Sequence, residues 1–403
     1  MGKKSKIYIW LCYLLSLSSG MQMSGQQFVL VDMKNEFAIS NALMAAITSV
    51  QLVTSVVMTL IMSGIMDKVD HRKLVVFGGG VSTLGILLSG FSTGPVMTTA
   101  SLIIGGIGSN ITMAIPFSIF TSLDPDNITK HVNIQQGALS FGAFASPLIL
   151  AVLMNSLGLN WRWHYRLAAL MLLGIVIMFF VVKPEKQINE MPQSEEKPVM
   201  HKGKSVIFSA TFIFASLGLA LYMAMEAGML NYAKQYFTVG LDDVIGASWC
   251  ISLIRLSMTI TRLWGGKLIK NRVTMGVVTF ALSGVSLLLM ALFPIPVVAL
   301  VWCVLFGLFA GPCWPTIFSM GLEIDTTASG KISNLMMLLN SAGMHLGNLV
   351  VGAFIDANGI RESFFLSAGF AIPGIIVFLL AVYAFRKAGM VPEGREWLEA
   401  QQK

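Results

Sequence analysis

The stretch LYMAMEAGMLNYAKQYF, residues 221–237, places one carboxylate, Glu226, among apolar residues. The next apolar run contains two guanidinium groups, Arg255 and Arg262. A charged side chain at the centre of a membrane helix costs about 2.5–3.5 kcal/mol on insertion scales, and such residues mark solute or ion pathways. A carboxylate there can bind and release a proton, and a guanidinium can hold an anionic group through two hydrogen bonds. These three residues are therefore the first candidates for solute binding or proton coupling.

Other polar side chains that could bind a solute lie in further apolar runs. Gln22 and Gln26 are four residues apart and share one face of a helix. Their amides can donate to and accept from hydroxyl or carboxylate groups, as can those of Asn110 and Asn340. His345 could relay protons, because histidine titrates near neutral pH. Hydrogen bonding between neighbouring helices would explain the same residues, so both interpretations stay open.

Sequence signals of catalysis or of bound cofactors do not occur. The chain has no HExxH, CxxC or GxxxxGK[ST] motif, and its four cysteines lie scattered in apolar runs. We therefore predict a protein that is not an enzyme and binds no metal and no cofactor.

The amino-acid composition indicates that this protein lies in a lipid membrane. Only 12% of its 403 residues are charged and 55% are hydrophobic, whereas a soluble domain carries roughly 25% charged residues. A net charge of +7 would suggest nucleic acid as the partner of a soluble protein. Here the basic residues follow the ends of apolar runs instead, so the predicted partner is the lipid bilayer and no nucleic acid is expected.

Twelve apolar runs are long enough to cross a bilayer as helices. The sequence thus predicts an all-α integral membrane protein with twelve transmembrane helices. They lie at residues 7–31, 39–65, 74–93, 96–121, 133–155, 165–182, 206–233, 243–266, 273–293, 296–320, 333–355 and 363–385.

The basic residues predict the orientation in the membrane. An even number of helices puts both termini on one side, and 20 of the 27 Lys and Arg residues fall in the ends and loops of that side. Five fall in the opposite loops and two inside a helix. By the positive-inside rule, both termini are cytoplasmic in the cell (inner or plasma) membrane. Reading the basic, apolar start as a signal peptide is the alternative, but its removal would leave eleven helices.

Internal similarity divides the chain into two halves. IPFSIFTSL around Pro116 matches WPTIFSMGL around Pro315, at an offset of 199. Arg72 and Arg272 correspond at an offset of 200, and Ser140 and Ser341 begin matching segments at an offset of 201. The sequence therefore predicts two pseudo-symmetric six-helix bundles joined by a hydrophilic linker. The predicted parts are an N-terminal bundle at 1–182, a cytoplasmic linker at 183–205, a C-terminal bundle at 206–386 and a cytoplasmic tail at 387–403.

The segment SGIMDKVDHRK resembles the loop between helices 2 and 3 of the major facilitator superfamily, with Asp67, Lys68 and Arg72 in register. The whole chain resembles permeases of that superfamily. TRLWGGKLIKNR, PTIFSMGL and NIQQGALSFGAF look most like its sugar-permease branch, which includes fucose and glucose/galactose transporters. The resemblance implies that Asp67 and Arg72 are gating residues that latch the cytoplasmic ends of helices in the outward-open state. A charged loop that only fixes topology is the alternative.

Helix lengths predict that Glu226 and Arg255 lie at equal depth. Glu226 lies 11 residues before Phe237, near the end of one predicted helix. Arg255 lies 11 residues after Val244, near the start of the next predicted helix. At 1.5 Å per residue, each lies about 16 Å below the outer surface. A solute or proton that breaks and remakes their contact would use the pair for transport, whereas a permanent ion pair would only hold two helices together.

The predicted function is secondary active transport of a small polar or anionic metabolite, an organic acid or a sugar, by alternating access. The predicted partners are this solute and a proton, and the protein is expected to be a monomer. Efflux of drugs or amphiphiles by antiport is a second hypothesis, since many Met and Phe residues suit an adaptable apolar cavity. A non-transporting membrane receptor or scaffold is a third.

Overall fold

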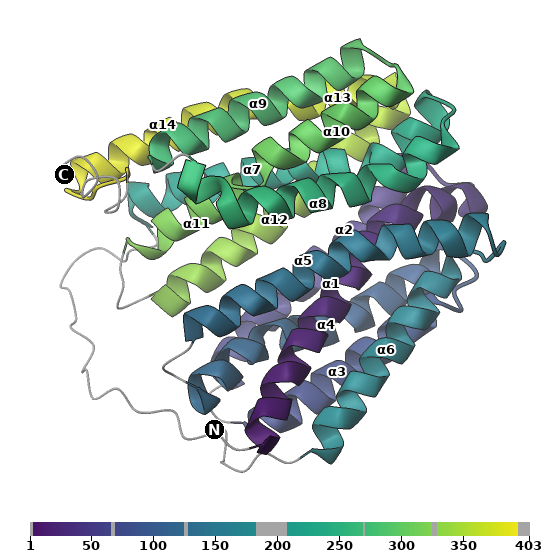
Figure 1. Cartoon of the computed structure of the whole chain (residues 1–403), viewed down its shortest axis with the longest axis vertical. Helices are drawn as coiled ribbons and strands as arrows, with labels where there is room; N and C mark the ends of the chain where they lie inside the picture. Colours follow the sequence, from purple (N-terminus) through teal and green to yellow (C-terminus); the bar gives the residue numbers. More distant parts are fainter. Residues whose placement is uncertain are drawn as a thin grey trace. The chain divides into compact units, whose positions relative to one another are not determined.

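The computed structural model describes residues 3–65, 69–124, 128–182, 208–268, 271–324 and 329–393, and every regular element in this part of the chain is a helix (Figure 1). The chain forms two compact units, Met1–Glu195 and Glu196–Lys403. The predicted linker, 183–205, lies outside the described residues, as does the predicted tail beyond residue 393.

Unit 1 contains six helices in its described part, and α1 packs along α5 while α3 packs between α4 and α6 (Figure 1). They are α1 (Lys3–Phe37), α2 (Asn41–Ile65), α3 (His71–Ser89), α4 (Pro95–Leu123), α5 (Ile128–Asn155) and α6 (Arg162–Val181).

Unit 2 is centred on its first helix, which packs against α8, α11, α12, α13 and α14. Its elements are α7 (Ala210–Gln235), the π-helix η3 (Tyr236–Gly240), α8 (Val244–Leu268), α9 (Arg272–Leu292), α10 (Pro296–Ala310), α11 (Cys313–Leu322), α12 (Ser329–Asn358), α13 (Glu362–Gly369) and α14 (Ala371–Lys387).

The predicted all-α membrane fold is confirmed. Eleven helical segments of the described chain are long and apolar enough to cross a membrane. The remaining long helix, α1, has 35 residues, and a polar stretch that includes Gln22 and Gln26 makes it less apolar. With α1, the segments correspond to the twelve predicted helices.

Two of the predicted helices are each broken in the middle. The run predicted at 296–320 forms α10 and α11, which are separated by Gly311 and Pro312, and the run predicted at 363–385 forms α13 and α14. Proline lacks the N–H that a helix needs, so Pro312 and Pro373 each leave a preceding carbonyl without its helical partner. Hydropathy alone cannot register these breaks, because the residues on both sides are apolar.

Corresponding positions of the two units have the same local roles. Asp70 and Asn271 accept hydrogen bonds from the first N–H groups of α3 and α9, respectively. Pro95 and Pro296 begin α4 and α10. Both pairs correspond at the offset that relates Ser140 to Ser341 in the internal repeat. These shared capping residues explain why α3 and α9, and likewise α4 and α10, begin at equivalent positions of the two halves.

Glycines set equivalent helix contacts in the two units. A Cβ on Gly142 of α5 would lie 2.2 Å from the carbonyl oxygen of Leu17 on α1. A Cβ on Gly343 of α12, the equivalent position in the second half, would lie 2.2 Å from the carbonyl oxygen of Ala220 on α7. Both helix pairs therefore approach backbone to backbone, which requires a residue without a side chain.

Candidate functional site

The structure pairs Glu226 on α7 with Arg255 on α8. Arg255 Nη1 donates to Glu226 Oε1 over 3.3 Å, and each side chain is 7% exposed. Removing two charges from water costs several kcal/mol each, and their mutual attraction offsets this only while both partners are present. The two residues therefore form a buried unit in which each charge depends on the other.

Tyr222 extends this polar region along α7. It lies one turn before Glu226, and the two side chains interact electrostatically. Its hydroxyl donates to the carbonyl oxygen of Ala310, the last residue of α10, over 2.9 Å. The break between α10 and α11 supplies that free carbonyl group, because the helix does not continue to satisfy it.

Arg262 binds the same break from α8. Its Nε donates to the carbonyl oxygen of Gly311 over 3.3 Å, and its side chain is otherwise exposed. Arg262 also lies within electrostatic range of Arg255. The structure thus brings together Glu226, Arg255 and Arg262, and it adds Tyr222 and a broken helix that the sequence analysis did not include.

The polar residues of α12 have separate partners. Asn340 accepts a hydrogen bond of 2.8 Å from Trp314 Nε1, and the indole of Trp314 stacks on Phe318. His345 is buried, with 6% of its surface exposed. Asn348, three residues later, accepts from Asn231 of α7 over 2.9 Å. This part of α12 therefore combines polar side chains with contacts that hold it against α7.

In unit 1 the three predicted amides lie on α1 and α4. Gln22 and Gln26 are half-buried on α1. Asn110 is half-buried on α4, and its Nδ2 donates to the carbonyl oxygen of Gly106 on the same helix over 2.7 Å. No role for these three residues follows from their contacts within unit 1.

Of the two predicted gating residues, Asp67 lies outside the described residues. Arg72 begins α3 and binds the end of α6, where its Nε donates to the carbonyl oxygen of Phe179 over 3.1 Å and its Nη2 donates to that of Phe180. A cation near the last carbonyl groups of a helix is favourable electrostatically. Within unit 1, Arg72 therefore ties the start of α3 to the end of α6.

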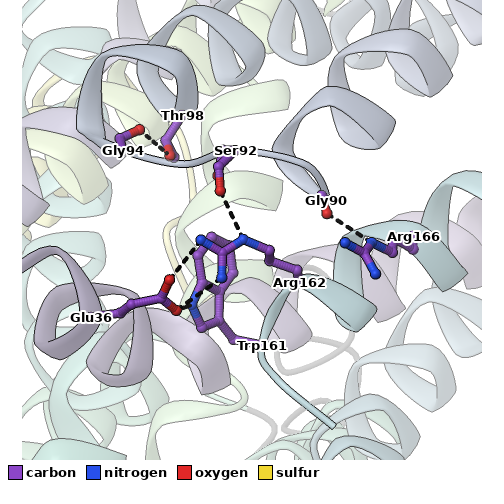
Figure 2. Close-up of polar contacts among 8 residues, drawn as sticks. All are labelled: Glu36, Gly90, Ser92, Gly94, Thr98, Trp161, Arg162 and Arg166. Atoms are coloured by element: carbon purple, nitrogen blue, oxygen red, sulfur yellow. Dashed lines mark hydrogen bonds and ion pairs between the residues drawn. The ribbon is translucent and has the colours of Figure 1, made fainter.

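A cluster that the sequence analysis missed joins the end of α1, the segment between α3 and α4, and the start of α6 (Figure 2). Arg162 at the start of α6 donates twice to the Glu36 carboxylate, over 2.9 and 2.6 Å, and Trp161 Nε1 donates to the same carboxylate over 2.6 Å. Arg162 Nε also donates to the carbonyl oxygen of Ser92 over 2.7 Å. We call Glu36, Ser92, Trp161 and Arg162 the Glu36 cluster.

Unit 2 repeats one bond of this cluster. Arg361 Nε donates to the carbonyl oxygen of Ala291 over 2.8 Å, and these two residues correspond to Arg162 and Ser92 in the internal repeat. The arginines in loops were read from the sequence only as markers of topology. The sequence did contain a signal for this cluster. It was a Trp-Arg pair in one predicted loop and a glutamate in another predicted loop on the same side of the membrane.

The described residues include no group of three or more His, Cys, Asp or Glu side chains that could hold a metal ion. What the site offers is one buried ion pair, a histidine, several amides and a broken helix. An apolar helical protein with such a polar interior belongs to the class of multi-pass membrane transporters.

The sequence pattern of the Major Facilitator Superfamily matches residues 12–329. The chain belongs to this superfamily.

Curated relatives and solved structures agree with this assignment. The chain is 21% identical over 366 residues to "Protein TsgA homolog" from Buchnera aphidicola subsp. Baizongia pistaciae, covering 88% of this chain and 87% of that protein. It is 21% identical to "Protein TsgA" from Escherichia coli O157:H7, covering 78% of this chain and 80% of that protein.

The fold is similar to that of several transporters. A bacterial homolog of the human lysosomal transporter Spinster, in an inward-facing and unoccupied conformation, has a TM-score of 0.82 at 13% identity, covering 96% of this chain and 98% of that chain. A POT family transporter in complex with a thioalcohol-conjugated peptide has a TM-score of 0.76 at 13% identity, with coverages of 94% and 96%. The nucleoside transporter NupG has a TM-score of 0.70 at 17% identity, with coverages of 94% and 99%.

Replacement of one partner of the buried pair should destabilise the protein strongly. Glu226→Leu or Arg255→Leu leaves a buried charge without its partner, and we expect each to lower the free energy of unfolding by about 3–5 kcal/mol. The double variant should lose less unfolding free energy than the sum of the losses of the two single variants. The measurement is reversible unfolding of the purified protein in detergent.

Arg272 and Glu323 provide the matched control, since they form an ion pair in the same unit with bonds of 2.8 and 2.9 Å, but 54% of the Glu323 side chain is exposed. Glu323→Leu should cost less than about 1 kcal/mol. Equal losses of unfolding free energy for Glu226→Leu and Glu323→Leu would show that the buried ion pair contributes no more to stability than the exposed one.

The Glu36 cluster should make stability depend on acidic pH. Hydrogen bonds from Arg162 hold the pKa of the Glu36 carboxyl below its ordinary value of 4.5. A carboxyl with a lowered pKa contributes stability above its ordinary value, and the contribution is lost as pH falls through the folded-state pKa. The melting temperature of the native protein should therefore fall more steeply below about pH 4.5 than that of Glu36→Gln. If the melting temperatures of the two proteins fell in parallel with pH, the stabilising role of the Glu36 carboxylate would be contradicted.

Proposed function

We propose that this protein is a secondary active transporter that moves a small polar or anionic metabolite, an organic acid or a sugar, together with a proton. The superfamily assignment supports transport by alternating access. We further propose that it works as a monomer in the inner membrane with both termini in the cytoplasm. The bias of Lys and Arg toward one set of loops supports that orientation.

The observation that carries the proposal is the buried contact between Glu226 and Arg255. Protonation of Glu226 would remove the negative charge that holds Arg255. The guanidinium could then bind an anionic or hydroxyl group of the solute in place of the carboxylate, and deprotonation would restore the ion pair and expel the solute. One carboxylate therefore couples proton binding to solute binding through a single shared partner.

The neighbouring groups suit such an exchange. The hydrogen bond of Tyr222 to a backbone carbonyl keeps its hydroxyl close to Glu226. Arg262 adds a second positive charge near Arg255, which makes the surroundings of the pair net basic. A net basic region favours anionic or hydroxyl-rich solutes over lipophilic cations.

The remaining candidates are proposed as supporting contacts. Gln22, Gln26 and Asn110 would offer amides from unit 1, and Asn340 and His345 would offer polar groups from α12. His345 is the alternative proton carrier. Arg72, with Asp67, is proposed to hold helix ends of unit 1 during gating. Transporters of similar fold carry peptides and nucleosides, which are polar metabolites of moderate size.

Proton-driven transport can be tested with the purified protein in proteoliposomes. Organic acids, sugars, dipeptides and nucleosides are offered with and without an imposed pH gradient. We expect the gradient to drive accumulation of one solute class up to about tenfold, because a gradient of one pH unit supplies about 1.4 kcal/mol per proton. Glu226→Gln, whose amide oxygen can still accept from Arg255, should lose accumulation and keep exchange of internal for external solute, since exchange moves no net proton.

The exposed glutamate at the start of α13, Glu362, gives the control. Glu362→Gln should accumulate solute as the native protein does. The proposal fails if no solute of these classes accumulates in response to the gradient, or if Glu226→Gln accumulates it normally.

A further inference from the structure

His131, near the start of α5, has a partner at each ring nitrogen. Its Nδ1 lies 2.6 Å from the hydroxyl oxygen of Tyr13 on α1, and its Nε2 lies 2.9 Å from Asp124 Oδ2 at the end of α4. The imidazole stacks on Phe120 of α4, with ring centroids 5.3 Å apart and an angle of 26° between the rings. Three helices of unit 1 therefore fix both the position and the plane of this ring.

These contacts satisfy the ring in both of its protonation states. In the neutral ring, Nε2–H donates to the carboxylate of Asp124 and the lone pair of Nδ1 accepts from the Tyr13 hydroxyl. When a proton binds at Nδ1, the new N–H donates to the Tyr13 oxygen, whose own hydrogen turns away. One proton is gained at Nδ1 and the hydrogen bond with Tyr13 reverses its direction, so the site can load and unload without rearranging its helices.

The exposure of the three side chains falls from Asp124 to Tyr13. The side chain of Asp124 is 23% exposed, that of His131 is 8% exposed, and Tyr13 is 6% exposed. The part of α5 that is apolar enough to span the membrane begins at Ile134, so His131 lies just outside it. Among the described residues, the titratable groups facing the ring are Asp124 from the end of α4 and Tyr13 from α1, with the buried thiol of Cys12 next to Tyr13.

We propose that Tyr13, His131 and Asp124 form a proton-binding site in unit 1, in addition to Glu226 and Arg255 in unit 2. The proton is held at Nδ1 of the imidazole, between the ring and Tyr13. There its positive charge pairs with the carboxylate and strengthens the link between α4 and α5. In the proposed orientation this end of unit 1 is cytoplasmic, and the site therefore responds to cytoplasmic pH. The inference goes beyond the proposed function, since it requires neither a solute nor proton coupling at Glu226.

The test is nitrogen NMR of the full-length protein, labelled with ¹⁵N-histidine and held in detergent. The chain has only five histidines, so the signal that disappears in His131→Gln assigns the ring. We expect this ring to gain a proton as the pH is lowered and to carry its proton on Nε2 when neutral. In Asp124→Asn the ratio of protonated to neutral ring at a given pH should fall about tenfold or more, because a neighbouring opposite charge is lost.

Two further variants sharpen the result. Asp70→Asn, which keeps a residue that can cap α3, should leave the His131 signals unchanged. Tyr13→Phe, which keeps the aromatic packing, should shift the Nδ1 signal alone. A His131 ring that gains no proton at any pH at which the protein stays folded, or an equal ratio of protonated to neutral ring in Asp124→Asn and the native protein, would overturn the proposal. Because no solute is present, this outcome is independent of whether transport is found.

Discussion

Unit 2 depends on the mutual neutralisation of a carboxylate on α7 and a guanidinium on α8. Loss of either charge would leave the other buried among apolar helices without this ion pair, at a cost of several kcal/mol. Their pairing fixes how α8 lies against α7 at Glu226 and Arg255. The break between α10 and α11 supplies backbone carbonyl groups to Tyr222 and Arg262 beside the pair. The result is a small polar region in which a proton or a solute can replace one existing contact with another.

The two units share a scaffold and differ in its chemistry. Helix caps, a proline at the start of one helix and glycines at close contacts recur at equivalent positions of the two halves. Glu226 has no such counterpart, because the equivalent residue of the first half is Gln26. Residues that recur serve the packing of each bundle, whereas the residues that differ are those to which we assign transport. In unit 1, ionisable groups gather at the helix ends instead, around Glu36 and around His131.

Apolar runs predicted nearly every helix within a few residues, because a chain in lipid must satisfy its backbone hydrogen bonds internally and can do so as a helix. The Glu226–Arg255 contact could be anticipated because the two helices are consecutive and antiparallel. The Glu36 cluster and the contact of Tyr13 with His131 could not, since their partners lie 118–126 residues apart and meet only through the packing of α1 against α5 and α6. The broken helices were missed because apolar residues continue through Pro312 and Pro373.

The central claim is that the Glu226–Arg255 contact changes during transport and does more than hold α7 against α8. Exchange of the two charges, in the variant Glu226→Arg/Arg255→Glu, tests it most directly when unfolding and solute accumulation are measured on the same preparation. The account predicts stability well above that of either single charge reversal, but no accumulation, because the proton-carrying carboxylate and the guanidinium that receives the solute have changed places. Accumulation of solute at the native rate by this double variant would contradict the claim. The ion pair would then serve only to hold α7 and α8 together.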